Sequence, residues 1–296
     1  MFKGVYTALL TPFKYGELDL VAFEKMLEWQ IQSGVSGMII GGSTGEGQNL
    51  SKDELLKLLE IAVKKANKKV KIIANTGLSS TSKSIDLTID AQKLKVDGVM
   101  LVAPYYVKPT QEGLYQHFKA IHDSSKTPII IYNIPGRTGI DISNETLVRL
   151  SSLERVLGLK DSTGNVLRCG QLKQEITSKF DILAGDDSLT LPYYTQGAVG
   201  VISVASNIIP SLIVKMHDLW FENNISEAIK LQNMLRRLNE DLYCETNPAP
   251  LKYAASQFEL CSPDLRLPLA PLSERSKKIV RETLQDLKVK LYGREK

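Results

Sequence analysis

The strongest constraint on the fold is an eightfold alternation of short apolar runs and amphipathic segments along the first 224 residues. Short apolar runs bounded by turn residues are typical of buried strands, whereas apolar residues three or four positions apart are typical of helices. The clearest amphipathic segment follows Ser51 and Glu54, whose spacing predicts a capping box at the start of a helix. The predicted strands are residues 5–10, 37–40, 71–74, 98–102, 129–132, 156–160, 182–184 and 200–203. Besides the segment after Ser51, the predicted helices are residues 20–32, 82–94, 111–124, 144–151, 166–176, 188–196 and 210–222.

Eight strand–helix units in succession predict an α/β fold, the (β/α)8 TIM barrel, which needs roughly 250 residues. A doubly wound sheet is the alternative, but its first strand is usually followed by a glycine-rich phosphate-binding turn. Here the first strand runs into Thr11 and Pro12 instead. Beyond residue 224 the alternation stops, and helical patterns cover residues 225–243, 250–257 and 273–291. We therefore predict a catalytic barrel over residues 1–224 and a C-terminal α-helical extension over residues 225–296.

Charge and cysteine content argue against several classes of protein. The 296 residues include 37 basic and 33 acidic ones, and a net charge of +4 gives no reason to expect a nucleic-acid or membrane partner. No apolar stretch approaches the roughly 18 residues of a membrane span, and the N-terminus does not resemble a signal peptide. Cys169, Cys244 and Cys261 are widely spaced, which fits a reducing compartment and predicts a cytoplasmic protein. The three histidines lack metal-site spacing, so we predict no metal.

The active site of a barrel lies at the carboxyl ends of its strands, and the sequence places a lysine at one of them. Lys160 ends the sixth predicted strand and is followed at once by turn residues. A lysine in that position has its stem in the core and its amine in the cleft above. Removal from water disfavours an ammonium ion, which makes a buried amine a usable nucleophile. A lysine whose head reaches solvent is the alternative interpretation.

Hydroxyl groups follow the neighbouring predicted strands. The second strand runs into residues 41–47, where four glycines surround Ser43 and Thr44. Such a loop lets backbone N–H groups approach a carboxylate, although a flexible turn before a helix is the alternative. Tyr106 follows the fourth strand and Tyr132 ends the fifth. Tyrosines often only pack at strand ends, but beside a lysine and a hydroxyl loop they suggest a proton relay.

Charged residues follow the fifth and seventh predicted strands. Arg137 carries five donors in a planar fork, which suits a substrate carboxylate, although an arginine in this position could simply face solvent. Asp186 and Asp187 follow the seventh strand and could form an acid or metal pair. We favour the interpretation that these two residues cap the following helix and shape its loop.

Motifs near successive strand ends carry a family resemblance. They are GGSTGEG, PYY, YNIPGRTG, GLKDSTGN, GDD and GVISV, with TNPAPLK in the extension. Together they resemble the pyruvate-dependent class I aldolase family over nearly the whole chain. In detail they are similar to its members that condense pyruvate with aspartate 4-semialdehyde to 4-hydroxy-tetrahydrodipicolinate, a step of lysine and diaminopimelate biosynthesis. The resemblance implies a lyase on a TIM barrel.

The resemblance also implies catalytic roles. Lys160 would form a Schiff base with pyruvate, so that no separate cofactor is needed, while Tyr132, Ser43 and Tyr106 would pass protons. In the family the tyrosine that matches Tyr106 reaches the site of a neighbouring subunit, which implies a homo-oligomer, usually a tetramer. A non-catalytic binding protein on the same scaffold is an alternative, which the presence of the lysine and both tyrosines disfavours.

Substrate-binding roles follow from the same resemblance. Thr44 would hold the pyruvate carboxylate and Arg137 the carboxylate of the semialdehyde, while Gly185 and Ile202 would line the pocket through backbone groups. Ser43 departs from the two threonines that are common here, and a serine–threonine pair also resembles N-acetylneuraminate lyase. That lyase, or a related pyruvate-dependent aldolase, is the alternative function. We give Arg137 more weight, because those lyases do not usually carry an arginine at this position.

A second departure concerns regulation. Members of the family that lysine inhibits carry a glutamate on the third helix and histidines on the second, around a tyrosine that Tyr105 matches. Here Lys83 replaces the glutamate, and Lys52 and Leu55 replace the histidines. A cation in place of an anion repels the effector's ammonium group. We therefore predict that lysine does not inhibit this protein at physiological levels.

Overall fold

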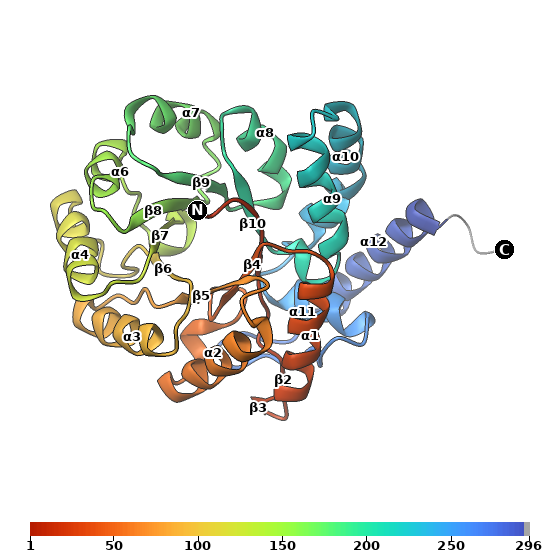
Figure 1. Cartoon of the computed structure of the whole chain (residues 1–296). Coiled ribbons are helices and arrows are strands. Elements are labelled where there is room, and N and C mark those ends of the chain that lie inside the picture. Colours follow the sequence, from red (N-terminus) through yellow and green to blue (C-terminus); the bar gives the residue numbers. More distant parts are fainter. Residues whose placement is uncertain (293–296) are drawn as a thin grey trace.

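Eight parallel strands close into a barrel, as predicted (Figure 1). This computed structural model describes the backbone of residues 1–292 and the side chains of residues 1–288. The strands are β1 (Gly4–Ala8), β4 (Gly37–Ile40), β5 (Lys71–Asn75), β6 (Gly98–Val102), β7 (Ile129–Asn133), β8 (Val156–Asp161), β9 (Asp181–Ala184) and β10 (Gly200–Ser203). Strands adjacent in this list are paired, and β1 also pairs with β10, which closes the barrel. The architecture is therefore that of a TIM barrel.

A ring of helices surrounds the strands (Figure 1). The helices are α1 (Leu20–Gln32), α2 (Lys52–Ala66), α3 (Thr81–Lys93), α4 (Gln111–Ser124), α6 (Asn144–Ser151), α7 (Val166–Glu175), α8 (Thr190–Thr195) and α9 (Pro210–Phe221). The predicted capping box begins α2, because the Ser51 hydroxyl accepts from the Glu54 N–H at 3.2 Å and the Glu54 carboxylate accepts from the Ser51 N–H at 2.8 Å. Local sequence thus determines where this helix starts.

Three local features differ from the prediction. The predicted helix 188–196 is shorter, because Pro192 lacks an N–H group and is confined to the first turn of α8. A hairpin of β2 (Phe13–Lys14) and β3 (Glu17–Leu18) was not predicted, since two-residue strands carry too little pattern. Its turn has positive φ at both central positions, which is typical of tight hairpins. The four-residue helix α5 (Pro135–Thr138) was also not predicted.

The helical pattern beyond residue 224 forms α10 (Ile225–Asp241), α11 (Ala249–Gln257) and α12 (Glu274–Tyr292). Helix α10 packs against α9 and α12, and α11 packs against α12, so the extension gathers on one side of the barrel (Figure 1). The boundary at 224 falls between α9 and α10, and the division into two units stays a prediction. Residues 293–296 of the predicted extension lie outside the described residues. None of the helices in the described part of the chain could span a bilayer.

Strand β8 contains one extra residue at Leu157. Ile129 pairs with Val156, but the next residue, Ile130, pairs with Gly158. Val156 packs in the outer core between strands and helices, whereas Leu157 packs against the core inside the barrel. A one-residue bulge changes which face the following side chains occupy. Beyond the bulge, Tyr132 of β7 is in register with Lys160 of β8.

A buried histidine lies between α3 and α4. His117 is 5% exposed, and its Nδ1 lies 2.9 Å from the Thr81 hydroxyl. Its Nε2 is buried, and no hydrogen-bond partner lies within reach among the described residues. Burial therefore disfavours the charged ring and lowers the pKa of His117 to about 4.

This shift predicts a loss of stability in mild acid. An ordinary histidine has a pKa of 6.5, so the unfolded chain binds this proton before the folded protein does. The contribution of His117 is complete above that pKa and is lost as pH falls toward 4. We expect it to lower the free energy of unfolding by about 2 kcal/mol between about pH 7.5 and about pH 5. Urea denaturation of the parent and of His117→Phe at both pH values measures this difference, and an unchanged pH dependence in the variant would contradict it.

Candidate active site

A cavity of about 170 Å³ lies at the carboxyl ends of the strands. Most of the predicted site residues line it, although they are far apart in the sequence. Its lining consists of Ser43, Thr44, Tyr132, Ile134, Arg137, Lys160, Ser162, Gly164, Gly185, Asp186, Val204, Tyr243 and Asn247. The predicted lysine, one of the two tyrosines, both loop hydroxyls, the arginine and Gly185 thus meet around one space.

Lys160 places a buried amine in this cavity. The residue is 5% exposed, and its Nζ lies 4.1 Å from the centre of the Tyr132 ring. Among the described residues no carboxylate forms an ion pair with Lys160. The alternative of a lysine whose head reaches solvent is therefore not supported, because the amine ends in a cavity with a tyrosine beside it. An amine held in this way can act as a nucleophile toward a carbonyl compound.

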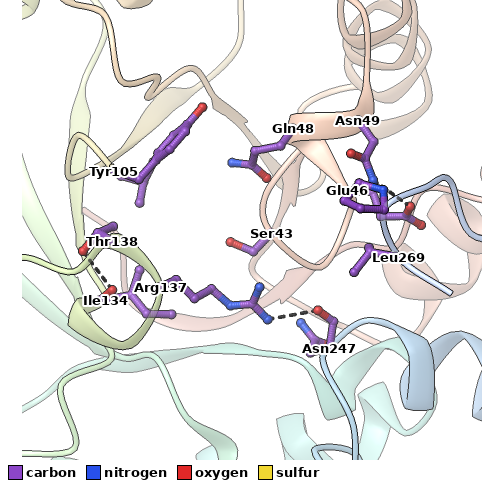
Figure 2. Close-up of a pocket in the computed structure, with 12 residues that line it drawn as sticks. Ser43, Glu46, Gln48, Asn49, Tyr105, Ile134, Arg137, Thr138, Asn247 and Leu269 are labelled. Atoms are coloured by element: carbon purple, nitrogen blue, oxygen red, sulfur yellow. Dashed lines mark hydrogen bonds between the residues drawn. The ribbon is translucent and has the colours of Figure 1, made fainter. Parts of the chain in front are cut away.

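A second cavity of about 260 Å³ adjoins the first. The two share Ser43, Ile134, Arg137 and Asn247 as lining residues. Figure 2 shows the Ser43 hydroxyl and the Arg137 guanidinium on the same side of this second space, with Tyr105 at its other end. Together the two cavities reach the size of an ordinary small-molecule site.

The glycine-rich loop after β4 is held firmly in place. A Cβ on Gly47 would lie 1.8 Å from the Gly41 carbonyl oxygen, so only glycine allows this turn. The Asn75 amide donates to the Gly41 carbonyl at 3.0 Å, and the Thr11 hydroxyl donates to the Gly45 carbonyl at 2.7 Å. These bonds to the loop backbone argue against the alternative of a flexible turn. The loop presents Thr44, which is 3% exposed, to the cavity.

A buried ion pair joins this loop to the extension. Lys252 of α11 lies 2.5 Å from the Glu46 carboxylate, and both side chains are 0% exposed. Lys252 also donates to the Asp264 carbonyl at 2.7 Å, and Glu46 accepts from the Arg266 N–H at 3.1 Å. Burial lowers the pKa of Lys252, which Glu46 opposes by favouring the charged form.

Arg137 is also connected to the extension. It lies on α5, and its Nη2 donates to the Asn247 carbonyl oxygen at 2.9 Å (Figure 2). The Asn247 side chain donates to the Thr44 hydroxyl at 3.0 Å. An arginine with one donor engaged in this way keeps its other donors for a ligand.

Two predicted site residues lie outside the described cavities. Ile202 is 0% exposed and packs with Tyr132 in the core inside the barrel. Tyr106 is 91% exposed and has a φ of 74°, which is strained for an aromatic residue. Strain of this kind is concentrated at functional sites. Within its own chain, however, Tyr106 does not reach the lysine cavity.

The two aspartates after β9 hold loops, as we favoured from the sequence. The Asp186 carboxylate accepts from the Ser188 N–H at 2.8 Å. The Asp187 carboxylate accepts from the N–H groups of Val204 and Ala205 at 2.8 and 2.9 Å, which joins the loop after β9 to the loop after β10. Among the described residues no group of three or more His, Cys, Asp or Glu side chains could hold a metal ion.

Sequence reasoning missed Glu46, Asn247 and Lys252 as parts of the site. Asn247 and Lys252 belong to the TNPAPLK motif of the extension, which entered only as part of the family resemblance. Residues about 200 positions apart cannot be paired from one sequence. The only signal in the sequence was that Lys252 of the TNPAPLK motif and Glu46 of the GGSTGEG motif had no other assigned role, so the two opposite charges could pair.

A closed parallel barrel with a buried amine, hydroxyls and a guanidinium at the carboxyl ends of its strands defines the class of protein, a TIM-barrel enzyme. The family model of the dihydrodipicolinate synthetase family matches residues 1–287, and the chain belongs to this family.

Individual relatives agree with this assignment. The 4-hydroxy-tetrahydrodipicolinate synthase of Pelagibacter ubique is 45% identical over 287 residues, covering 96% of this chain and 98% of that protein. The solved structure of the 4-hydroxy-tetrahydrodipicolinate synthase of Methylacidiphilum fumariolicum is 43% identical and superposes with a TM-score of 0.96 over 98% of this chain and 97% of that one. The chloride-inhibited dihydrodipicolinate synthase of Acinetobacter baumannii, solved with pyruvate, is 40% identical, with a TM-score of 0.95 over 97% and 99% of the two chains.

Proposed function

We propose that this protein condenses pyruvate with aspartate 4-semialdehyde to 4-hydroxy-tetrahydrodipicolinate. The observation that carries the proposal is the buried amine of Lys160 in a cavity shared with Tyr132, Thr44 and Arg137. Membership of the dihydrodipicolinate synthetase family supports the same reaction. The enzyme is a lyase of the aldolase type, and its carbon nucleophile arises on the lysine itself.

The first half of the proposed reaction takes place on Lys160. Its amine adds to the ketone carbon of pyruvate, and water leaves to give an iminium ion. The cationic nitrogen draws electrons, so a methyl proton departs and an enamine forms. Thr44 and the backbone of its loop hold the pyruvate carboxylate, because N–H and O–H donors converge there. Gly185, and in our prediction Ile202, line the site through backbone groups.

The second half joins the two substrates. The enamine carbon bonds to the aldehyde carbon of the semialdehyde, while Arg137 engages its carboxylate. The substrate's amino group then attacks the iminium carbon, which closes the ring and releases Lys160. No separate cofactor takes part in these steps. A guanidinium at the junction of the two cavities suits a second substrate that must reach the first.

We propose that protons pass through Tyr132, Ser43 and Tyr106, with Tyr106 supplied by a second copy of the chain. The 91% exposure and strained φ of Tyr106 support a role outside its own subunit. The proposed assembly is a homo-oligomer, and a tetramer is our prediction. The three free cysteines favour a reducing compartment, in keeping with the predicted cytoplasmic location.

Turnover of pyruvate with aspartate 4-semialdehyde, followed through a coupled reductase, tests the proposed function. N-acetylmannosamine serves as the competing acceptor in a parallel assay that follows the consumption of pyruvate. Turnover with the semialdehyde alone is expected, and turnover with the sugar would establish the lyase alternative. If neither acceptor reacts, borohydride trapping with pyruvate decides whether Lys160 forms an adduct at all.

Arg137 should determine the choice of the second substrate. We expect Arg137→Ala to lower kcat/KM for aspartate 4-semialdehyde roughly 10- to 100-fold, because a charge-assisted bond to its carboxylate is lost. The pyruvate concentration that half-saturates borohydride trapping should change little. Arg149, whose side chain pairs with Glu112 on the outer helices, provides a matched arginine for the control variant Arg149→Ala. Equal losses in the two variants would contradict the assignment.

Lysine should not inhibit turnover at physiological concentrations. Lys83 is exposed on α3, and the family resemblance places this cation where an effector's ammonium group would bind. Lys52 forms an ion pair with Asp90 of α3, and Leu55 is only 5% exposed, so neither offers a ligand atom in place of a histidine. Steady-state assays with added lysine measure the effect, and inhibition below about 1 mM, a binding free energy of about −4 kcal/mol, would overturn the prediction.

A further inference from the structure

One residue of the extension contacts two substrate-binding side chains. Asn247 is 5% exposed and lines both cavities. Its side-chain amide donates to the Thr44 hydroxyl at 3.0 Å, and its backbone carbonyl accepts from the Arg137 guanidinium at 2.9 Å. Thr44 follows β4 and Arg137 follows β7, so Asn247 links two separate corners of the barrel.

The direction of the amide bond determines what Thr44 can offer. A hydroxyl has one proton to donate and two lone pairs that accept. Because the Thr44 oxygen accepts from Asn247, its own proton stays available for a carboxylate in the cavity. The guanidinium is likewise held by only one of its five donors. Asn247 thus orients both donors without consuming their capacity to bind an anion.

The position of Asn247 is itself fixed by buried contacts. Lys252, five residues further along, forms the fully buried ion pair with Glu46, which lies two residues after Thr44. One short segment of the extension therefore contacts the same loop at two residues, Thr44 and Glu46. Two contacts fix the position of the loop relative to Asn247.

We propose that Asn247 is a positioning residue that couples the two substrate sites, holding Thr44 for the pyruvate carboxylate and Arg137 for the carboxylate of the second substrate. This inference rests on the proposed function. Its consequence is that the extension takes part in substrate binding and does more than cover the barrel. Loss of the side chain frees Thr44, whereas an acid at this position draws the Thr44 proton to itself and places a negative charge beside Arg137.

Variants of Asn247 and of a matched amide test the proposal. Gln232, on α10, also reaches from the extension to the barrel, where its amide donates to the carbonyls of Asp187 and Ser188 at 3.0 and 3.2 Å. Its side-chain oxygen, like that of Asn247, is buried, with no partner among the described residues. Gln232→Ala therefore measures the loss of a comparable amide that touches neither Thr44 nor Arg137.

We expect Asn247→Ala to raise the half-saturating pyruvate concentration in borohydride trapping about five- to tenfold, which is the range of one hydrogen bond. The KM for aspartate 4-semialdehyde should change little in Asn247→Ala, because alanine keeps the backbone carbonyl that accepts from Arg137, and kcat should also change little. Asn247→Asp, which preserves the volume, should raise both constants further than alanine does. Gln232→Ala should lower the melting temperature and leave both constants unchanged.

The possible results separate this inference from the function on which it rests. If Asn247→Asp behaves like the parent, or if both Asn247 variants lower kcat at unchanged half-saturation, the positioning role is wrong while the function stands. If the parent forms no adduct with pyruvate, the proposed function itself is wrong. Three results together would support the coupling: a higher half-saturating pyruvate concentration in both Asn247 variants, a higher KM for the semialdehyde in Asn247→Asp, and no change in Gln232→Ala.

Discussion

Replacement of Lys160 by alanine is expected to lower turnover on the order of 10⁴-fold and to abolish the adduct that borohydride traps with pyruvate, because the covalent path loses its nucleophile. Lys160→Arg is the matched variant, since it keeps a cation and a long stem but cannot form the iminium ion. Mass spectrometry of the trapped protein and the coupled assay together measure the two effects. An adduct or substantial turnover in either variant would contradict the assigned role.

Removal of the Lys160 amine with the side-chain volume retained should not harm the fold. Lys160 is 5% exposed and contributes no ion pair among the described residues, so its amine adds little to stability. A polar group kept in a buried cavity for chemistry usually costs stability. Lys160→Met should therefore melt at the parent's temperature or above it. A marked drop in the melting temperature would mean that the lysine has a structural role that the cavity does not reveal.

Lys252→Ala is expected to destabilise the folded protein by about 3–5 kcal/mol, the largest effect on stability that we expect from one side chain. It leaves the Glu46 carboxylate, which is 0% exposed, without its cation in the interior. Lys230→Ala is the matched control, because Lys230 forms a similar pair with Glu227 but is 69% exposed, and such surface pairs contribute about 1 kcal/mol or less.

A double variant distinguishes the effect of losing the whole Lys252–Glu46 pair from the effect of leaving one buried charge unpaired. Glu46→Gln combined with Lys252→Met removes both charges and keeps the volume, and buried pairs replaced in this way often lose little stability. We therefore expect the double variant to be more stable than Lys252→Ala. Chemical denaturation of the four proteins measures the differences. Similar losses in Lys252→Ala and Lys230→Ala would show that the buried charge is not the cause.

The barrel could be predicted from the sequence because its signals are local and repeated. Each strand is a short apolar run, and each helix has its own periodicity or cap, as at Ser51 and Glu54. The topology follows from the repetition of the strand–helix unit, since eight such units in succession leave few arrangements other than a barrel. The hairpin at residues 13–18 and the helix α5 were missed because two to four residues carry no period.

The candidate site could be predicted only where it follows the strands. Lys160, Tyr132 and Thr44 lie at or just beyond strand ends, so the fold itself brings them together. Asn247 and Lys252 come from the extension, whose packing on the barrel depends on tertiary contacts that no local pattern specifies. Tyr106 could be singled out by its motif, but within its own chain it is 91% exposed and lies outside the lysine cavity.

The bulge at Leu157 determines which face of β8 carries the Lys160 amine. Lys160 lies four positions after Val156, an even step, so in a regular strand both side chains would point the same way. Yet Val156 packs outward under the helices, and Lys160 faces the cavity, because one additional residue reverses the alternation between them. A substitution elsewhere in this strand leaves the direction of the Lys160 side chain unchanged. Removal of the bulged residue would instead point the amine away from the cavity, toward the surrounding helices. The lysine therefore reaches the cavity only because of the register of the strand, which the bulge sets, and not because of its residue type alone.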